Sequence, residues 1–330
     1  MKILANEALF PLGDFSCHAS HFEFLPDGSL FAVWFQGTAE GNDDVCIYGA
    51  RRVNGHWDTP RRLSPEDGLP HWNPVLHQTN DGRLLLFYKA GREIGTWRTE
   101  VMASTDGGAS FSPPRELVPG DAGGRGPVRN KILVASDGAW LAPASTETDG
   151  WKAFVDRSED GGRTWTRGAD VLLPEACLRP HVPVDPARRG LIQPSLWEDP
   201  KRPGHISTLL RSTEGFIFRA DSEDFGRSFG PAYPTGVPNN NSGLDLDRLP
   251  DGRLLLACTP VGVASDGVWG ARTPLSLLES RDNGRTFSLV TEIETGEGTF
   301  AYPALRCRDG RVHLTYTWNR RLIRYVCLEI

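Results

Sequence analysis

Five polar side chains recur along the chain at similar intervals, and their types could bind and transform a polar ligand. They are Asn73, Asn130, Gln193, Asn241 and Tyr302. Asn130 follows Asn73 by 57 residues, Gln193 follows Asn130 by 63, and Tyr302 follows Asn241 by 61. Amides donate and accept hydrogen bonds, as does a phenol. The regular spacing predicts one polar site to which most repeats contribute, although single Asn residues are also typical of turns.

Charged and aromatic side chains near these segments widen the chemistry that such a site could perform. His18 opens the first repeat, and a loop further along carries Glu40 and Asp43. The other candidates to contact a ligand are Trp34, Lys89, Lys131, Glu147 and Arg320. Aromatic rings stack on the apolar faces of sugars, whose hydroxyls need paired donors and acceptors. The set predicts a carbohydrate ligand, and it offers no third ligand that would make His18 part of a metal site.

One eight-residue pattern, Ser-x-Asp-x-Gly-x-Ser/Thr followed by an aromatic residue, indicates which elements must position these groups. It begins at Ser104, Ser158, Ser222 and Ser280, with steps of 54, 64 and 58 residues. The aspartate of such a segment accepts hydrogen bonds from its own turn, while the glycine adopts a left-handed conformation. We therefore expect the four aspartates to stabilise turns rather than to act on a substrate.

Asp-Gly pairs between short apolar runs mark the same period. They begin at Asp27, Asp81, Asp137, Asp251 and Asp309. Glycine supplies the positive φ of a tight hairpin, and the flanking runs, rich in Leu, Val, Phe and Tyr, are typical of strands. We expect an all-β chain that folds as a single domain over residues 1–330, a six-bladed β-propeller with four-stranded antiparallel blades. A first strand near residues 3–10 would pair with the last blade and close the ring.

The composition excludes several classes of protein. The 330 residues include 36 Gly and 25 Pro, which break helices, so an all-helical bundle is excluded. A formal net charge of −6 without a Lys/Arg-rich run argues against a nucleic acid partner. No apolar run reaches the roughly 18 residues of a membrane span. We expect a soluble, cytoplasmic protein with no membrane partner and no cofactor, of an oligomeric state that the sequence does not fix.

The repeated boxes and the blade pattern resemble the sialidase (neuraminidase) superfamily, whose repeats are known as BNR or Asp-box repeats. The resemblance extends over nearly the whole chain. It implies that Arg211 and Arg272 bind a substrate carboxylate and that Tyr302 is the nucleophile. A phenol suits this role because a carboxylate nucleophile would be repelled by the acid group of the sugar. Glu40, or else Asp43, stands where the family places its acid/base.

The sequence departs from the family pattern at two places. A His-Ala-Ser-His segment beginning at His18 replaces the Arg-Ile-Pro motif of the first inner strand, so one carboxylate-binding arginine is missing. Gln193 stands nearest to the place of the glutamate that activates the tyrosine, and a glutamine cannot accept a proton. Glu147 and Glu297 are the alternatives for that role.

Three functions fit these observations. The first is an exo-acting glycoside hydrolase of the sialidase superfamily, which removes a terminal acidic sugar such as a sialic acid from an oligosaccharide. The second is a lyase or a rhamnosidase-like enzyme on glycans that contain uronic acids, because Arg, His, Lys and Tyr together could neutralise a uronate and remove its proton. The third is a non-catalytic propeller that binds carbohydrate, since a fold alone does not determine a function.

Overall fold

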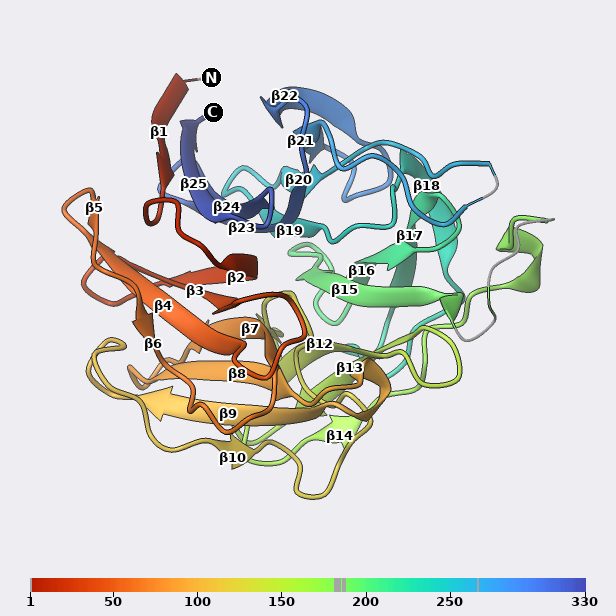
Figure 1. The fold of residues 1–330 in the computed structure, drawn as a ribbon. Coiled ribbons are helices and arrows are strands. Elements are labelled where there is room, and N and C mark those ends of the chain that lie inside the picture. Colours follow the sequence, from red (N-terminus) through yellow and green to blue (C-terminus); the bar gives the residue numbers. More distant parts are fainter. Residues whose placement is uncertain (1, 181–184, 186–187, 266) are drawn as a thin grey trace.

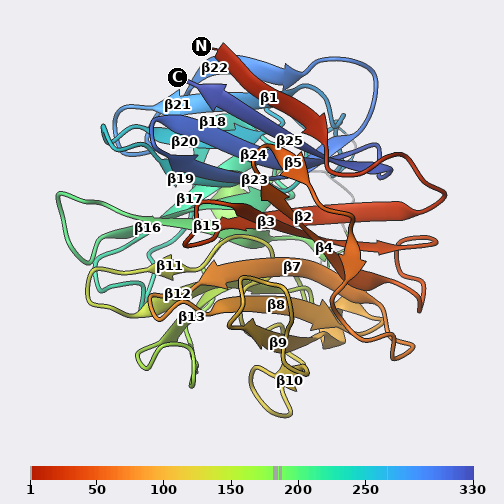
Figure 2. The ribbon, with the colours of Figure 1, turned by 90° about the vertical axis from the view of Figure 1, so that its left-hand side faces the viewer.

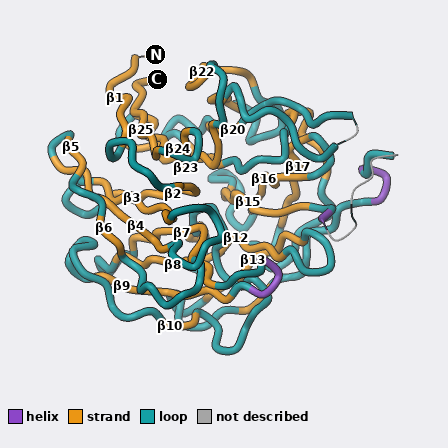
Figure 3. The backbone as a smooth tube through the Cα atoms, viewed as in Figure 1, coloured by secondary structure: helices purple, strands orange, loops and turns teal. Residues whose placement is uncertain are grey.

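The chain folds into six antiparallel sheets, arranged as the blades of a β-propeller (Figure 1). The computed structural model describes residues 2–180, 185, 188–265 and 267–330. Within these residues the helical elements are two short 3₁₀ turns, Ile94–Thr96 and Glu175–Cys177, and loops connect the strands (Figure 3). The predicted all-β, six-bladed architecture is confirmed.

The first three blades are formed by consecutive segments of the chain, each beginning with its innermost strand. The first blade contains β2 (Ser16–Phe24), β3 (Leu30–Gly37), β4 (Cys46–Val53) and β5 (His56–Trp57), with β6 (Arg61–Arg62) also paired to β4. The second contains β7 (His71–Gln78), β8 (Leu84–Ala90), β9 (Arg98–Ser104) and β10 (Arg115–Glu116). The third contains β11 (Leu133–Val134), β12 (Trp140–Thr146), β13 (Lys152–Ser158) and β14 (Thr166–Arg167).

The last three blades follow the same order, except that the N-terminal strand completes the sixth. The fourth blade contains β15 (Leu191–Glu198), β16 (Ile206–Ser212), β17 (Phe216–Ser222) and β18 (Tyr233–Pro238). The fifth contains β19 (Asp245–Arg248), β20 (Leu254–Cys258), β21 (Leu275–Ser280) and β22 (Ser288–Glu294). The sixth contains β23 (Phe300–Arg308), β24 (Arg311–Trp318), β25 (Leu322–Glu329) and β1 (Lys2–Ala8).

The ring is closed by pairing between the two ends of the chain. Strand β1 runs antiparallel to β25, with Lys2 opposite Glu329 and Ala8 opposite Arg324. The N- and C-terminal strands therefore lie side by side, as Figures 1 and 2 show. The predicted pairing of the first strand with the last blade is confirmed, and it covers the edge of β25 and holds the two ends of the chain together.

Neighbouring blades pack face to face through apolar side chains, which is why most strands are buried on both faces. All seven residues of β8 are buried, for example. Between the first two blades, Phe31 and Val33 belong to one apolar cluster with Leu76 and Leu86. This packing fixes the blades relative to one another, and it thereby fixes the ends of the innermost strands.

The Ser-x-Asp boxes form turns, as expected from the sequence. Asp106 accepts hydrogen bonds from the hydroxyl of Ser104 at 2.7 Å and from the amide of Ser110 at 2.9 Å. The same pair of bonds recurs at Asp160, Asp224 and Asp282. Ser104 pairs with Leu84, which in turn pairs with Gln78 at the last position of β7. The boxes therefore lie at the opposite end of the blades from the start of the innermost strands.

A residue with positive φ occurs at or just before the start of five of the six innermost strands. These residues are Ala19 (55°), Asn73 (45°), Gln193 (54°), Asn241 (61°) and Tyr302 (55°). The ladder pairing is interrupted at four of the five positions. For a residue other than glycine, such a conformation costs about 1–3 kcal/mol. Strained residues of this kind are typical of functional sites. The recurring residues predicted from the sequence therefore occupy equivalent positions in their blades. There are two exceptions: Ala19 and not His18 holds this position in the first blade, and Asn130 has an ordinary φ.

A buried ion pair near the centre of the ring connects four blades. Nζ of Lys131, just before β11, lies 2.8 and 2.7 Å from the two carboxylate oxygens of Asp245, the first residue of β19. The same carboxylate accepts hydrogen bonds from the hydroxyl of Ser195 at 2.8 Å and from the amide of Leu305 at 2.8 Å. Because a buried charge is costly unless it is paired and hydrogen-bonded, this contact fixes the innermost strands of blades three to six relative to one another.

We predict that Asp245→Asn lowers the free energy of unfolding by about 3–5 kcal/mol, because the charge of Lys131 stays buried without its partner. Asp251→Asn is the matched control. It removes an exposed carboxylate that pairs with Arg253, and should cost no more than about 1 kcal/mol. Urea denaturation of the two variants measures the difference. Equal losses in both variants would show that the central pair does not hold the ring together.

Candidate active site

The phenolic oxygen of Tyr302, near the start of β23, accepts two hydrogen bonds. Nη1 of Arg211 lies 2.9 Å from it, and Nε2 of Gln193 lies 3.1 Å from it. The orientation of the Gln193 amide is fixed, because its Oε1 accepts a hydrogen bond from Arg211 at 3.2 Å and a guanidinium group can only donate. Side chains from β23, β15 and β16 therefore meet at one oxygen atom, and we call these residues and their neighbours the Tyr302 cluster.

A glycine leaves room for this contact. A Cβ atom added to Gly243 would lie 3.3 Å from Cδ2 of Tyr302 and 3.4 Å from Oε1 of Gln193. Separations this short are tighter than ordinary van der Waals contact, so any side chain at position 243 would press on both the ring and the amide. The loop before β19 thus forms one wall of the Tyr302 cluster.

Arg211 is held in place before any ligand arrives. Its Nε donates a hydrogen bond to Oδ1 of Asn241 at 2.8 Å. Its Cζ lies 5.0 Å from the ring centroid of Trp151 and 5.4 Å from that of Trp269, distances at which a cation is attracted to an aromatic ring. Only 4% of Arg211 is exposed, and among the described residues no carboxylate forms a hydrogen bond with it.

A second buried arginine lies behind the tyrosine. Arg129 is 1% exposed, and its Cζ lies 5.2 Å from the ring centroid of Tyr302. Nη2 donates to the carbonyl of Pro303 at 2.7 Å, whereas Nε and Nη1 find no partner among the described residues. Burial lowers the pKa of Arg129 to about 10, so the group remains charged at neutral pH. Buried donors without acceptors are rare in proteins, and they mark this region as one that favours negative charge.

Two further arginines stand at the outer side of the cluster. Arg272 lies just before β21, and its charge lowers the pKa of Tyr302. Arg320, which follows β24, forms an ion pair with Glu40 on the loop after β3. The charges of Arg320 and Glu40 both act on Arg272, whose pKa is lowered first of all by burial. Beside Arg272, the sixth blade therefore contributes a positive charge and the first blade a negative one.

The surroundings of Tyr302 favour its ionised form. Burial alone would raise the pKa of Tyr302, but the charge of Arg211, the hydrogen bond from Gln193 and the charge of Arg272 together outweigh it. The pKa of the phenol therefore lies below its ordinary value. A tyrosine with a lowered pKa, in contact with arginines, is a candidate nucleophile or base.

His18 packs against the tyrosine as a neutral ring. The two ring centroids are 4.2 Å apart, and Nδ1 of His18 lies 2.9 Å from the hydroxyl of Thr317. Burial, followed by the charges of the neighbouring arginines, holds the pKa of His18 well below its usual range. Its Nε2 is buried without a partner among the described residues. His18 thus adds no positive charge to the cluster at neutral pH.

One carboxylate acts on Tyr302 from the third blade. Glu147 follows β12, and its charge raises the pKa of Tyr302 in opposition to the arginines. Burial raises the pKa of Glu147 itself, while the charge of Arg211 lowers it. Of the two glutamates that the sequence offered in place of a base at position 193, Glu147 is the one at the cluster, because Glu297 has no polar contact with it among the described residues.

Two residues predicted to bind the ligand lie in the interior instead. Trp34 is fully buried, and its ring centroid lies 4.8 Å from that of Phe10. Lys89 is also fully buried, and its Nζ donates to the hydroxyl of Thr99 at 2.7 Å and to the carbonyl of Arg125 at 2.7 Å. Both placements correct the sequence-based prediction, because β3 and β8 direct these side chains into the packing between blades.

Two other predicted residues are engaged away from the Tyr302 cluster. Lys131 is bound to Asp245 in the central ion pair and lines a cavity on the other side. Asp43 forms an exposed ion pair with Arg92 at 2.8 Å. Neither side chain contacts Tyr302 among the described residues, so the structure does not place them as predicted. Of the two acid/base candidates on the first-blade loop, Glu40 is the one beside the cluster.

The remaining recurring amides have different surroundings. Asn130 is fully buried and donates from Nδ2 to the carbonyl of Gln193 at 3.1 Å and to that of Pro194 at 2.9 Å. It therefore positions Gln193, and it is not free to bind a ligand through that nitrogen. Asn241 orients Arg211, as described above. The side chain of Asn73 has no hydrogen bond among the described residues and is available to a ligand.

Two members of the cluster were not among the predicted site residues. Arg129 directly precedes Asn130, so the recurrence of polar segments pointed to its place, but one sequence does not show that it turns behind Tyr302. Trp269 is 51% exposed and belongs to the long loop between β20 and β21 of the fifth blade. No pattern in the sequence marks that tryptophan.

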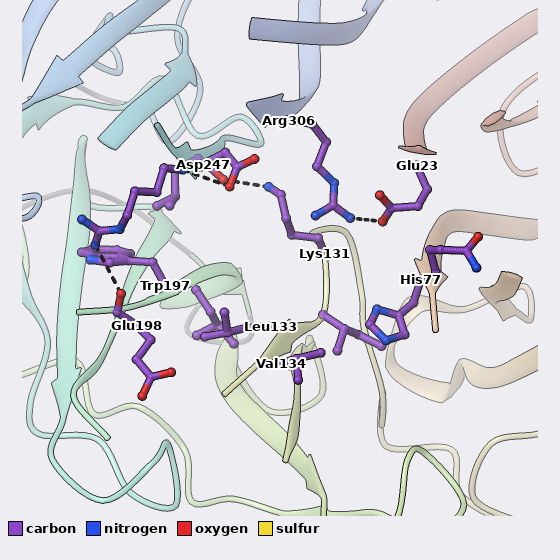
Figure 4. A pocket seen from close by; sticks show the side chains of 14 residues that line it. Glu23, His77, Lys131, Leu133, Val134, Trp197, Glu198, Asp247 and Arg306 are labelled. Carbon is purple, nitrogen blue, oxygen red and sulfur yellow. Dashed lines mark hydrogen bonds and ion pairs between the residues drawn. The ribbon is translucent and has the colours of Figure 1, made fainter. Parts of the chain in front are cut away.

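A cavity of about 450 Å³ lies at the other end of the innermost strands, on the side of the Ser-x-Asp boxes. Figure 4 shows Arg306 and Glu23 paired across it, with Lys131 nearby and Trp197 on the opposite wall. Two of its cations are paired with carboxylates, Arg306 with Glu23 and Lys131 with Asp245, unlike Arg129 and Arg211 near Tyr302. The described residues contain no group of three or more His, Cys, Asp or Glu that could hold a metal ion. They also contain no helix long and apolar enough to cross a membrane.

Comparison with known proteins identifies the repeats. A family model described as a BNR repeat-like domain matches residues 28–314. No curated protein matches the sequence. Among solved structures, a protein of unknown function from Dyadobacter fermentans is similar with a TM-score of 0.77 and 19% identity, over 100% of this chain and 99% of that one.

Several sialidase structures are also similar at the level of the fold. The sialidase NanB from Streptococcus pneumoniae has a TM-score of 0.72 at 13% identity, with 98% of this chain and 70% of that chain covered. The Trypanosoma rangeli sialidase, in complex with the inhibitor DANA, has a TM-score of 0.70 at 13% identity, with 95% and 55% covered. The chain thus spans about half the length of the Trypanosoma enzyme.

The positive φ of Asn73 can be tested by substitution. Asn73 has a φ of 45° and no side-chain hydrogen bond among the described residues, so its substitution breaks no hydrogen bond of the side chain. We predict that Asn73→Val lowers the free energy of unfolding by about 1–3 kcal/mol relative to Asn73→Gly, because a β-branched residue is strained at positive φ. Thermal and urea denaturation of the pair measure this difference. Equal stabilities would mean that the strand does not turn at Asn73 as described.

Proposed function

The chain belongs to the BNR repeat-like family of the sialidase superfamily, diverging from true sialidases, and we propose that it is a glycoside hydrolase. In this proposal it removes a terminal acidic sugar, of the sialic acid type, from the end of an oligosaccharide. The observation that carries the proposal is that Tyr302, Arg211 and Arg272 belong to one cluster. A nucleophile and two groups that can hold a carboxylate thus stand together.

The arginines bind the acid group of the sugar. Arg211 and Arg272 offer guanidinium groups that have no carboxylate bound to them among the described residues, and such groups hold a carboxylate in a defined orientation. Arg320 acts on Arg272 from the same side, and its own charge is paired with Glu40. Trp269, exposed beside Arg211, offers a face on which a sugar ring can stack.

The reaction proceeds through the tyrosine. The ionised oxygen of Tyr302 attacks the anomeric carbon, the bond from that carbon to the glycosidic oxygen breaks, and Glu40 donates a proton to the leaving oxygen. A water molecule then attacks the same carbon, Glu40 takes up its proton, and the tyrosine oxygen leaves. The net change is the addition of one water across the glycosidic bond. The Trypanosoma rangeli sialidase, solved as a covalent intermediate with 2,3-difluorosialic acid, supports a mechanism of this class.

A second candidate, elimination on a glycan that contains uronic acid, is favoured by one observation. Tyr302 lies against the neutral ring of His18 while arginines surround both. Arginine can neutralise a uronate, and an ionised tyrosine can remove the proton beside it, so that the chain is cleaved without water. The products differ from those of hydrolysis, because elimination leaves an unsaturated sugar that absorbs in the ultraviolet.

We predict that the protein releases the terminal sugar from at least one oligosaccharide that ends in an acidic residue, with a gain of one water in the products. Tyr302→Phe should lower kcat/KM by roughly 10³-fold, because the nucleophile is lost. The measurement is mass spectrometry of the products from a panel of sialylated and uronate-containing oligosaccharides. Tyr233→Phe, which removes an exposed phenol on β18, is the control and should retain full activity.

Two results would contradict hydrolysis. Cleavage without the mass of water, together with ultraviolet absorbance by the products, would assign the second candidate instead. Full activity in Tyr302→Phe on a substrate that the wild type cleaves would remove the tyrosine from the mechanism altogether.

A further inference from the structure

We propose that Tyr302 rests as a phenolate in the free protein at neutral pH, held by hydrogen bonds from Gln193 and Arg211. In this view Gln193 is a positioning residue that stabilises the ionised oxygen, and no base is needed to activate it. The inference concerns the resting protein and holds for any sugar that the site accepts. Only its consequence for catalysis rests on the proposed function.

The hydrogen bonds at the phenolic oxygen come from two donors, and no described residue accepts its proton. Arg211 approaches at 2.9 Å and can only donate. Gln193 approaches at 3.1 Å through its nitrogen, since its oxygen is already turned to Arg211. Among the described residues the oxygen of Tyr302 accepts these two bonds and donates none. An oxygen that only accepts is suited to carry a negative charge.

The charged groups that face Tyr302 also favour its ionised form. Arg211 comes from β16, Arg272 from the segment before β21, and Arg129 from the segment before β11. Against these three guanidinium groups stands one carboxylate, that of Glu147 after β12.

The other two neighbours of the ring are uncharged. Gln193 of β15 is an amide, and His18 of β2 stays neutral because burial and the arginines lower its pKa. A phenolate therefore removes part of an excess of positive charge that is otherwise buried. In spite of its burial, the pKa of Tyr302 is lowered by Arg211, Gln193 and Arg272, and every tenfold gain in its ionisation constant lowers that pKa by one.

The phenolate explains why a glutamine replaces the glutamate that the family resemblance implies at this place. A glutamate at position 193 would bring a second negative charge to the phenolic oxygen and would accept its proton. The amide brings a donor instead. With the phenolate formed in advance, Tyr302 attacks without losing a proton during the step, and the only proton transferred is the one that Glu40 gives to the leaving oxygen. The same phenolate is restored when water completes the cycle.

Ultraviolet absorbance of tyrosinate tests this inference without any substrate. The chain contains 6 Tyr, so each ionised residue is a measurable fraction of the signal. At neutral pH, the difference spectrum of wild type minus Tyr302→Phe should show the band of one tyrosinate. The control, wild type minus Tyr233→Phe, should show none, because burial and the hydrogen bond to Asp221 raise the pKa of Tyr233 to about 12.

Gln193→Glu supplies the second variant, since it keeps Tyr302 and nearly the same shape. We expect its tyrosinate band to be absent at neutral pH and to appear only as the pH rises towards the ordinary range of a phenol, about 10. The absence of a tyrosinate band in folded wild type at neutral pH would overturn the inference. So would a band that persists unchanged in Gln193→Glu. A band that behaves as expected in a protein that cleaves no acidic sugar would leave the phenolate in place and reject the proposed function alone.

Discussion

Positive charge that is buried without a bound carboxylate is the constraint on which the site depends. Arg129 and Arg211 are 1% and 4% exposed, yet the hydrogen bonds that they form among the described residues go to a carbonyl, two amides and a phenol. Removing a guanidinium group from water is unfavourable unless negative charge lies close by. Tyr302 contacts both arginines and supplies negative charge when it is ionised, and the acid group of a sugar would supply the rest.

The fold supplies this arrangement through a feature that the blades share. Each innermost strand of blades one, two, four and six is interrupted near its start, and the residue at that point has a positive φ. The interruption brings Gln193 and Tyr302 to one place although they are 109 residues apart. Buried amides then hold the turned segments, since Asn130 binds the backbone at Gln193 and Asn241 binds Arg211. Strain at these points is balanced by the packing between blades.

The sequence predicts the fold well, because the repeated boxes and hairpin turns are local patterns whose residue types determine the conformation of the turn. It also identifies Tyr302 and Gln193, which are fixed by their place in a repeat, and Arg211, through the resemblance to sialidases. It fails where a side chain can turn to either side of a strand. Trp34 and Lys89 are of the right types but point into the packing between blades. Trp269 lies in a long loop within the fifth blade that carries no repeated pattern, so only the folded chain shows that it lies beside Arg211.

The central claim is that the cluster receives a negatively charged group. Isothermal titration compares DANA, the inhibitor bound by the Trypanosoma rangeli sialidase, with its methyl ester, in which a small methyl group removes the charge of the acid. Hydrogen bonds to charged groups contribute about 1.5–3 kcal/mol each, so the account predicts that the acid binds at least roughly 10-fold more tightly than the ester. Equal affinity, or tighter binding of the ester, would contradict it.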